Sequence, residues 1–229
     1  MADYAMLDSG DVVLDVGAGL GFLTKFVAGK CRRVLAVEFD ARVAEVLREQ
    51  VEDLSNVQIF VGDVLKVKVP EFGKVVSVPP YRISSRLVLW LFDRGFDCAV
   101  LVFQREFAGR LVASVGSGEY GWLAVFAYYY VDVELLDDVP RWMFFPQPEV
   151  DSVVVVLKPK KPKPFTLKNE EFFRRFVRLL FTQRNRKVRN AVLPFLRGER
   201  SGVVVPFGDR RVRELAPEDF GALANAFCP

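Results

Sequence analysis

The sequence predicts an α/β fold with a mainly parallel sheet, followed by a small helical domain. Short valine-rich runs alternate with helix-like segments in the first half of the chain, and this alternation is typical of parallel strands joined by right-handed crossover helices. A basic, proline-containing segment then precedes an apolar helical stripe. We therefore expect an α/β domain over residues 1–158, a linker over residues 159–164 and a small helical domain over residues 165–229.

The expected strands are short, apolar and rich in β-branched residues. Five of them cover residues 12–16, 33–38, 57–61, 74–78 and 98–103. Aromatic and β-branched residues predict a closing pair of strands at 123–136 and 150–157. Helical spacing or helix-opening signals occur in the segments ending at residue 28 and over 41–51, 87–92, 106–115, 172–180 and from 216 onward.

Composition excludes several classes of site. The chain has 229 residues, of which 51% are hydrophobic and 27% charged, so a packed core is expected. It has no histidine, which excludes catalytic imidazoles and histidine-bound zinc. Its three cysteines, Cys31, Cys98 and Cys228, lie far apart and support neither a disulfide framework nor a zinc site. With no apolar run of about 18 residues, we expect a cytoplasmic monomer that uses no metal and no membrane.

The net charge of +3 conceals an uneven distribution. Residues 158–213 contain 17 Lys and Arg against four acidic residues, a net charge of +13, while the remainder has a net charge of −10. Such a basic segment suggests a polyanionic partner such as a nucleic acid. Solvated basic helix faces explain the charge equally well, so charge alone does not decide between the two interpretations.

A glycine-rich loop is the first candidate site. Gly17, Gly19 and Gly21 follow the first expected strand and open the first expected helix, where glycines allow a ligand to approach the backbone closely. Glu38 ends the second strand, where its carboxylate could bind ribose hydroxyls, and Asp63 follows the third, where it could bind an adenine amino group. A solvent-exposed acid and a turn residue are the alternatives for these two. Together the three positions predict a Rossmann-like site for an adenosine-containing ligand.

A proline-rich turn is the second candidate site. Val78, Pro79, Pro80 and Tyr81 follow the fourth expected strand. The two prolines fix a turn that exposes a backbone carbonyl, and the tyrosine offers a flat face for stacking. This combination suits a base extruded from a nucleic acid. A simple proline turn beside a core tyrosine is the alternative.

These segments together resemble the ribosomal RNA adenine N6,N6-dimethyltransferases, a family that uses S-adenosylmethionine to modify small-subunit ribosomal RNA. The resemblance covers nearly the whole chain. Its most specific segment is FFPQPEVDSVVVVL, and the other matching segments are VLDVGAGLGFLT, GDVL, PPYRISS, FQREFA, SGEYG and FTQRNRK. The family implies a Rossmann-like methyltransferase domain, a small helical domain, and a role in ribosome assembly.

The resemblance also assigns residues to roles. It implies cofactor contacts from Gly17, Ala18, Gly19, Gly21, Glu38, Asp63, Val64 and Val78. It implies a target-base site made by Val78, Pro79, Pro80, Tyr81 and Phe144, with Tyr81 and Phe144 as two stacking faces. The basic positions Arg184, Arg186, Lys187 and Arg189 are the expected RNA phosphate contacts.

The chain departs from the family pattern in two ways. Val78 stands where the family usually has asparagine, which removes one hydrogen-bond acceptor for the target amine; losing such a group typically costs about 10²–10³ in rate. The family also has a segment before the first strand that covers the cofactor, whereas ten residues precede Asp11 here, so we expect an open cofactor pocket. A catalytically weak RNA-binding or ribosome-assembly factor is therefore an alternative function. A nicotinamide dehydrogenase is a third, supported by the glycine loop alone.

Overall fold

The computed structural model of the chain describes residues 1–195 and 204–228. Three charged residues of the basic stretch, Arg197, Glu199 and Arg200, lie outside the described residues. The four basic positions expected to contact RNA all lie within the described part of the chain.

The chain divides into two compact units. The first joins Met1–Ala108 to Asp132–Pro159, and the second joins Gly109–Val131 to Lys160–Pro229. The second unit begins near the expected linker at residues 159–164, but it also takes in an earlier segment that the sequence analysis assigned to the first domain. The contacts that explain this difference are described below.

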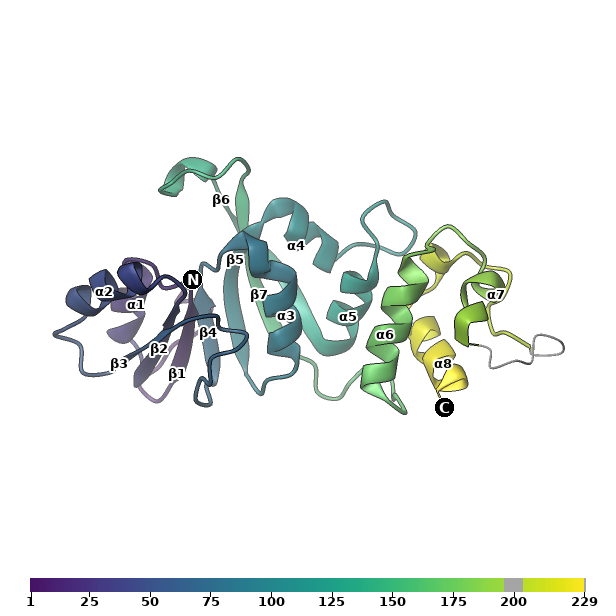
Figure 1. Cartoon of the computed structure of the whole chain (residues 1–229), viewed down its shortest axis with the longest axis horizontal. Helices are drawn as coiled ribbons and strands as arrows, with labels where there is room; N and C mark the ends of the chain where they lie inside the picture. The colour runs from purple at the N-terminus through teal and green to yellow at the C-terminus, as the bar shows by residue number, and fades with distance from the viewer. Residues whose placement is uncertain (196–203, 229) are drawn as a thin grey trace. The chain divides into compact units, whose positions relative to one another are not determined.

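A seven-stranded sheet forms the centre of the first unit (Figure 1). Its strands are β1 (Val12–Val16), β2 (Arg33–Glu38), β3 (Val57–Val61), β4 (Lys74–Ser77), β5 (Cys98–Gln104), β6 (Val131–Val139) and β7 (Ser152–Pro159). The strand order is β3-β2-β1-β4-β5-β7-β6. The first five strands pair in parallel and β7 runs antiparallel to β5, so the expected parallel sheet with a closing strand is present.

The helices of this part of the chain follow the strands in the expected alternation. They are α1 (Phe22–Ala28), α2 (Ala41–Gln50), α3 (Ser84–Phe92) and α4 (Arg105–Leu111), with the short 3₁₀ turns η1 (Tyr81–Ile83) and η2 (Arg141–Met143). α2 begins where Asp40 accepts a hydrogen bond from the Arg42 amide, and it buries Ala44 and Leu47. α4 ends at Leu111, four residues before the end expected from the sequence.

The central strands are buried along almost their whole length. Four of the five residues of β1 and six of the seven of β5 are buried. Parallel strands with both faces covered appear in a sequence as continuous apolar runs, which is the pattern that predicted them. The core therefore lies around these strands, and it holds their carboxyl ends, where the candidate sites lie, in fixed positions.

β1 and β4 separate at their carboxyl ends. Their pairing covers only Val13 with Lys74 and Leu14 with Val75. Beyond it, the buried Ser77 hydroxyl donates to the Val16 carbonyl (2.7 Å) and accepts from the Val16 amide (2.9 Å). Chain order reverses direction between these two strands, and ligands of open α/β sheets bind at such a switch point.

The described residues of the second unit are mainly helical and contain one isolated β-bridge, between Lys187 and Arg211. Its helices are α5 (Trp122–Tyr130), α6 (Glu170–Phe181), α7 (Val188–Ala191) and α8 (Pro217–Phe227), with 3₁₀ turns η3 (Leu193–Phe195) and η4 (Val212–Glu214). The Asn169 side chain accepts from the Phe172 amide and starts α6, whose apolar stripe is buried. α5, α6 and α8 pack against one another (Figure 1).

The strand expected over residues 123–136 is wrong in its first half. Residues Trp122–Tyr130 form α5, and only Val131–Val139 form a strand. Valine, phenylalanine and three tyrosines favour a strand by intrinsic propensity. In the structure seven of the nine residues are buried, and a helix that is apolar on all sides is stable in the interior. Tertiary packing therefore overrides the local preference.

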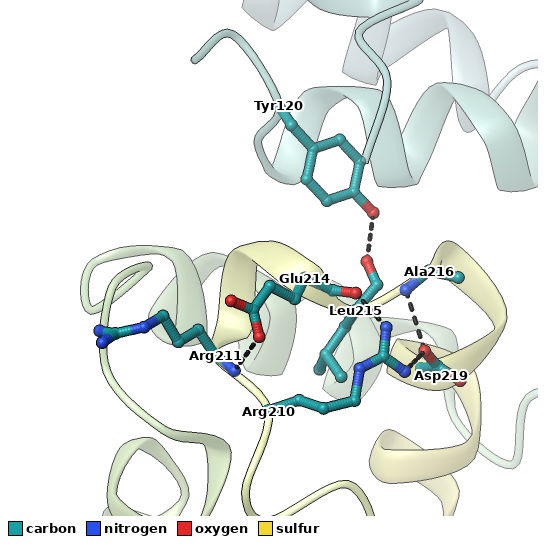
Figure 2. Close-up of polar contacts among 7 residues, drawn as sticks. All are labelled: Tyr120, Arg210, Arg211, Glu214, Leu215, Ala216 and Asp219. Atoms are coloured by element: carbon teal, nitrogen blue, oxygen red, sulfur yellow. Dashed lines mark hydrogen bonds and ion pairs between the residues drawn. The ribbon is translucent and has the colours of Figure 1, made fainter. Parts of the chain in front are cut away.

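Polar contacts explain why residues 109–131 belong to the second unit. The buried Tyr120 hydroxyl donates to the Leu215 carbonyl at 2.9 Å (Figure 2). The Arg184 guanidinium donates to the carbonyls of Ser117 and Gly118, both at 2.9 Å. These bonds attach the SGEYG segment to residues far along the chain, which charge and periodicity do not indicate.

The carbonyl that Tyr120 contacts lies in a braced turn before α8 (Figure 2). Asp219 accepts from the Ala216 amide at 3.0 Å and forms an ion pair with Arg210 at 2.8 Å, while Arg210 also donates to the Glu214 carbonyl. Arg210 and Asp219 thus fix the turn that leads into α8. Tyr120 connects the loop before α5 to this turn.

Changing Tyr120 to Phe is expected to lower the free energy of unfolding by about 1–3 kcal/mol, because the Leu215 carbonyl would lose its partner inside the protein. The measurement is urea-induced unfolding. The matched control is Tyr128→Phe, which removes a more exposed hydroxyl that pairs with Glu218 and is expected to cost less than about 0.5 kcal/mol. Equal effects of the two changes would contradict the anchoring role of Tyr120.

Candidate active site

The glycine loop has a left-handed backbone at each of its three glycines. Gly17, Gly19 and Gly21 have φ of +74°, +56° and +86°. The loop is attached to β2, because the amides of Gly17 and Ala18 both donate to the Val37 carbonyl, at 2.8 and 3.2 Å. The loop therefore crosses the carboxyl ends of β1 and β2 with its shape fixed by main-chain bonds.

Gly17 also brings the loop against the proline-rich turn. A Cβ atom at Gly17 would lie 2.7 Å from Pro80 Cδ, closer than such atoms approach in proteins. Only a residue without a side chain allows this contact. The glycine loop and the turn after β4, predicted separately from the sequence, thus form one site.

Gly17→Ala is expected to destabilise the protein by about 2 kcal/mol or more, since alanine is strained at this φ and its methyl group would displace a rigid proline ring. Thermal or urea unfolding measures the effect. Gly95→Ala is the matched control, because no atom lies within 4 Å of its added Cβ. A Gly17 variant as stable as the Gly95 variant would contradict the close contact.

A cavity of about 560 Å³ lies at these carboxyl ends. It brings together four residues assigned to the cofactor, Gly17, Glu38, Asp63 and Val64, with Pro80 of the turn. Ala18, Gly19, Gly21 and Val78 do not line it. The other lining residues are Val16, Val37, Phe39, Asp40, Gly62, Lys66, Arg82, Ile83 and Arg86.

Two carboxylates of the cavity are oriented by backbone amides. Glu38 accepts from the Gly19 amide at 2.9 Å and from the Asp40 amide at 3.0 Å. Asp63 accepts from the Leu65 amide at 3.0 Å, which makes it a turn residue as well as a cavity residue. Each carboxylate has further lone pairs that can accept hydroxyl or amino protons from a ligand.

Asp15 lies beneath the loop and is 1% exposed. It accepts from the Thr24 hydroxyl at 2.7 Å, which ties β1 to α1. Burial raises the pKa of Asp15 to about 7, although the hydrogen bond from Thr24 opposes the shift. Its charge state therefore changes near neutral pH, a property that the sequence did not indicate.

Tyr81, in the turn after β4, lies beside Phe144, which follows η2. Pro79 is buried, Pro80 is exposed along the cavity, and Val78 is partly buried against the core. The rings of Tyr81 and Phe144 lie 6.5 Å apart between centroids at an interplanar angle of 74°. They are neighbours as expected, but in an edge-to-face arrangement and not as two parallel faces.

Three contributors were missed by the sequence analysis. Arg82 lies over the Phe39 ring at 5.4 Å, and both line the cavity. Ser152 forms a 2.6 Å hydrogen bond with the Tyr81 hydroxyl. The position of Phe39 next to Glu38 could have indicated its role, whereas the contact of Ser152 depends on strand pairing across 71 residues.

The four basic residues expected to contact RNA have different surroundings. Arg184 is used internally, as described above. Lys187 and Arg189 both pair with Asp209, at 3.2 and 2.6 Å, and Arg186 bonds to the Gln183 side chain at 2.9 Å. Arg186, Lys187 and Arg189 are all exposed, so a polyanion can reach them.

Over residues 1–195 and 204–228, no helix combines the length and the apolar character that a membrane span requires. The same residues contain no group of three His, Cys, Asp or Glu side chains placed to hold a metal ion.

The strand order, with antiparallel β7 inserted beside β5, and the cavity at the switch point place the first unit in the Rossmann-like class, and solved structures identify it as the fold of S-adenosylmethionine-dependent methyltransferases. A dimethyladenosine transferase from Plasmodium falciparum superposes with a TM-score of 0.81 and 28% identity, over 96% of this chain and 90% of that one. The 23S rRNA methyltransferase ErmE superposes with a TM-score of 0.70 and 28% identity, over 100% and 95%.

The chain belongs to the ribosomal RNA adenine dimethylase family, whose pattern matches residues 1–224. A probable ribosomal RNA small subunit methyltransferase A from Methanosarcina acetivorans is 39% identical, with 96% of this chain and 85% of that protein aligned. A protein of the same name from Thermococcus onnurineus is also 39% identical, over 95% of this chain and 82% of its own length. The resemblance deduced from the sequence motifs is confirmed.

Proposed function

We propose that this protein transfers methyl groups from S-adenosylmethionine to the N6 atoms of adenines in small-subunit ribosomal RNA during ribosome assembly in the cytoplasm. The observation that carries the proposal is the contact of Gly17 with Pro80, which joins a nucleotide-type loop to a base-binding turn. Membership of the adenine dimethylase family supports the same reaction.

The residues of the cavity fit the adenosine part of S-adenosylmethionine. Glu38 is placed to accept from ribose hydroxyls, and Asp63 to accept from an adenine amino group. Phe39 and Val64 supply apolar contact for a flat base. When bound, the cofactor supplies a methyl group made electrophilic by its sulfonium; the protein contributes binding and orientation.

The turn after β4 provides the groups for the target adenine. The lone pair of an adenine N6 amine is delocalised into the ring, which makes the amine a poor nucleophile. The Pro79 carbonyl would accept a hydrogen bond from the N6 amine. This bond favours a tetrahedral nitrogen, whose lone pair is then free to attack the methyl group. Tyr81 and Phe144 would hold the extruded base by ring contacts. Neither task needs an imidazole, consistent with the absence of histidine.

The proposed RNA contacts lie in the second unit. Arg186, Lys187 and Arg189 would bind phosphates, whereas Arg184 would support the fold through Ser117 and Gly118. A backbone-directed interaction of this kind suits folded RNA, which is recognised largely by shape and phosphate position.

Replacing each of the three exposed basic residues by alanine (Arg186→Ala, Lys187→Ala, Arg189→Ala) is expected to weaken RNA binding. Each change should also reduce the slope of the logarithm of the binding constant against the logarithm of salt concentration by about one. Filter binding over a range of salt concentrations measures this. Asp209→Asn is the matched control: it removes the carboxylate that pairs with Lys187 and Arg189 and should strengthen binding. Unchanged salt dependence in all three variants would exclude these residues as phosphate contacts.

The direct test of the function uses small ribosomal subunits that lack N6-dimethyladenosine. The protein is incubated with them and with methyl-labelled S-adenosylmethionine, and the modified adenines are identified by mass spectrometry. We expect labelled N6-methyladenines from the natural chain and none from Tyr81→Ala, which removes the stacking ring. No labelled adenine at any salt concentration or temperature would reject the activity.

One observation favours a second candidate function. Val78 provides no hydrogen-bond acceptor where the family usually has asparagine. A chain that binds ribosomal RNA tightly but methylates it slowly would act mainly as an assembly factor. The two functions differ in the expected effect of Val78→Asn, which is treated in the Discussion.

A further inference from the structure

We propose that Ser152 is a positioning residue for the target adenine: its hydroxyl holds the phenol end of Tyr81 and thereby fixes the place of that ring beside the base. This inference rests on the proposed function, because it assigns roles around the target base. It concerns contacts within the first unit only.

Ser152 is placed where it can act as a rigid anchor. It is the first residue of β7, it is paired with Gln104 of β5, and it is completely buried. Its Oγ lies 2.6 Å from the Tyr81 hydroxyl oxygen. Because the sheet fixes the backbone of Ser152, the bond transmits that fixed position to the end of the Tyr81 side chain.

Tyr81 is also held at its backbone. The Ser84 hydroxyl donates to the Tyr81 carbonyl at 2.9 Å, in the first turn of the helix that follows. Tyr81 is thus restrained at both ends, by Ser84 at the main chain and by Ser152 at the phenol. Moving the ring away from this place by rotation about χ1 requires the hydrogen bond to Ser152 to break, whereas turning of the ring plane about its own axis leaves the phenol oxygen where it is.

Phe144 has no comparable restraint. Its side chain has no polar atom, and it packs at the margin of the core cluster. A base held between two rings needs parallel faces about 7 Å apart, two contact distances of about 3.5 Å. The centroids are already 6.5 Å apart, but the planes differ by 74°, so one ring has to turn. Because the phenol oxygen lies on the rotation axis of the Tyr81 ring, the hydrogen bond to Ser152 persists whichever ring turns.

The loop that carries Phe144 is closed at its base beside Ser152. Asp151 accepts from the Arg141 amide at 2.9 Å through its side chain, and its carbonyl accepts from the Arg105 amide at 3.2 Å. Ser152 therefore links the turn after β4 with the end of this loop. The two faces of the target-base site share one anchor point.

The kinetic test is a double-mutant cycle of Ser152→Ala and Tyr81→Phe, assayed on small subunits. Each change is expected to lower kcat about tenfold, because the reacting amine is less well oriented, and to leave the KM for S-adenosylmethionine within about twofold. The double variant should be no slower than the slower single variant. Tyr4→Phe, which removes a phenol hydroxyl from the surface, is the control and should keep full activity.

Two kinetic results would overturn the proposal. One is a double variant about 100-fold slower than the natural chain, since that would mean that the two hydroxyls act independently. The other is full activity of Tyr81→Phe, which removes the contact without altering the sheet and so remains informative if Ser152→Ala does not fold. A fall in kcat with a matching rise in the KM for S-adenosylmethionine would indicate general damage and would also reject it.

A measurement independent of catalysis follows the ring itself. With 3-fluorotyrosine in place of the six tyrosines, ¹⁹F NMR identifies Tyr81 as the resonance missing from Tyr81→Phe. We expect the Tyr81 resonance to shift and to broaden in Ser152→Ala, because the side chain then samples more than one χ1 rotamer. If the natural chain methylates no subunits, the proposed function fails. The ring measurement still decides the anchoring: a Tyr81 resonance that is unchanged in Ser152→Ala would overturn it.

Discussion

Val78→Asn is expected to raise the kcat for adenine methylation by about 10²-fold, because the amide oxygen would accept a hydrogen bond from N6 beside the Pro79 carbonyl. The natural side chain can make no such bond. Val78 is partly buried against the core, so the polar replacement should also lower the thermal stability slightly. Single-turnover methylation of small subunits, with both reactants saturating, measures the effect on the chemical step.

Val78→Ala is the control for this change, because it removes the same apolar contacts and adds no acceptor. It should be no faster than the natural chain. If Val78→Asn is no faster than Val78→Ala, the Pro79 carbonyl and the Tyr81 ring are sufficient for orientation. If only the asparagine variant has measurable activity, the natural chain functions as an RNA-binding factor.

Asp15 is expected to make the protein less stable as the pH rises from about 4 to about 7. Its pKa is raised from 3.8 to about 7 by burial, so between these values the folded protein retains a proton that the unfolded chain has lost. The stabilisation is complete below about pH 4 and is lost as the pH rises through the folded pKa. By linkage the total is on the order of 4 kcal/mol.

Asp15→Asn isolates this effect, since asparagine is neutral throughout and can still accept from Thr24. Urea unfolding at several pH values should show the stability difference between variant and natural chain shifting by a few kcal/mol in favour of the variant from pH 4 to pH 8. The exposed Asp53→Asn is the control and should track the natural chain. A constant difference for Asp15→Asn would contradict the raised pKa.

The fold of the first unit was largely predictable because its strands β1, β2 and β5 are largely buried. Such strands have nearly continuous apolar sequences and were located within a residue of their ends, as was the less buried β3. α5 was not predictable in this way: its aromatic residues have strand propensity, and the helix is selected by burial within the second unit. Local sequence does not contain that information.

The candidate site was predictable where it depends on chain order. Parallel strands present their carboxyl ends at one edge, so residues that follow β1, β2, β3 and β4 had to converge, and Glu38, Asp63 and Pro80 do line one cavity. Contacts across the sheet were not predictable. Ser152 meets Tyr81 only because β7 inserts next to β5, and Arg184 turns inward only because residues 117–118 fold beside it.

The grouping of residues 109–131 with the second unit means that the backbone passes from one unit to the other three times, after Ala108, Val131 and Pro159. A single proteolytic cut after Pro159 would release a piece without α5, leaving Phe173 of α6 without its aromatic neighbours Phe126 and Tyr129. The basic half of this protein is therefore not a detachable module, and exchanging it with that of a relative would require transplanting two separate stretches of chain.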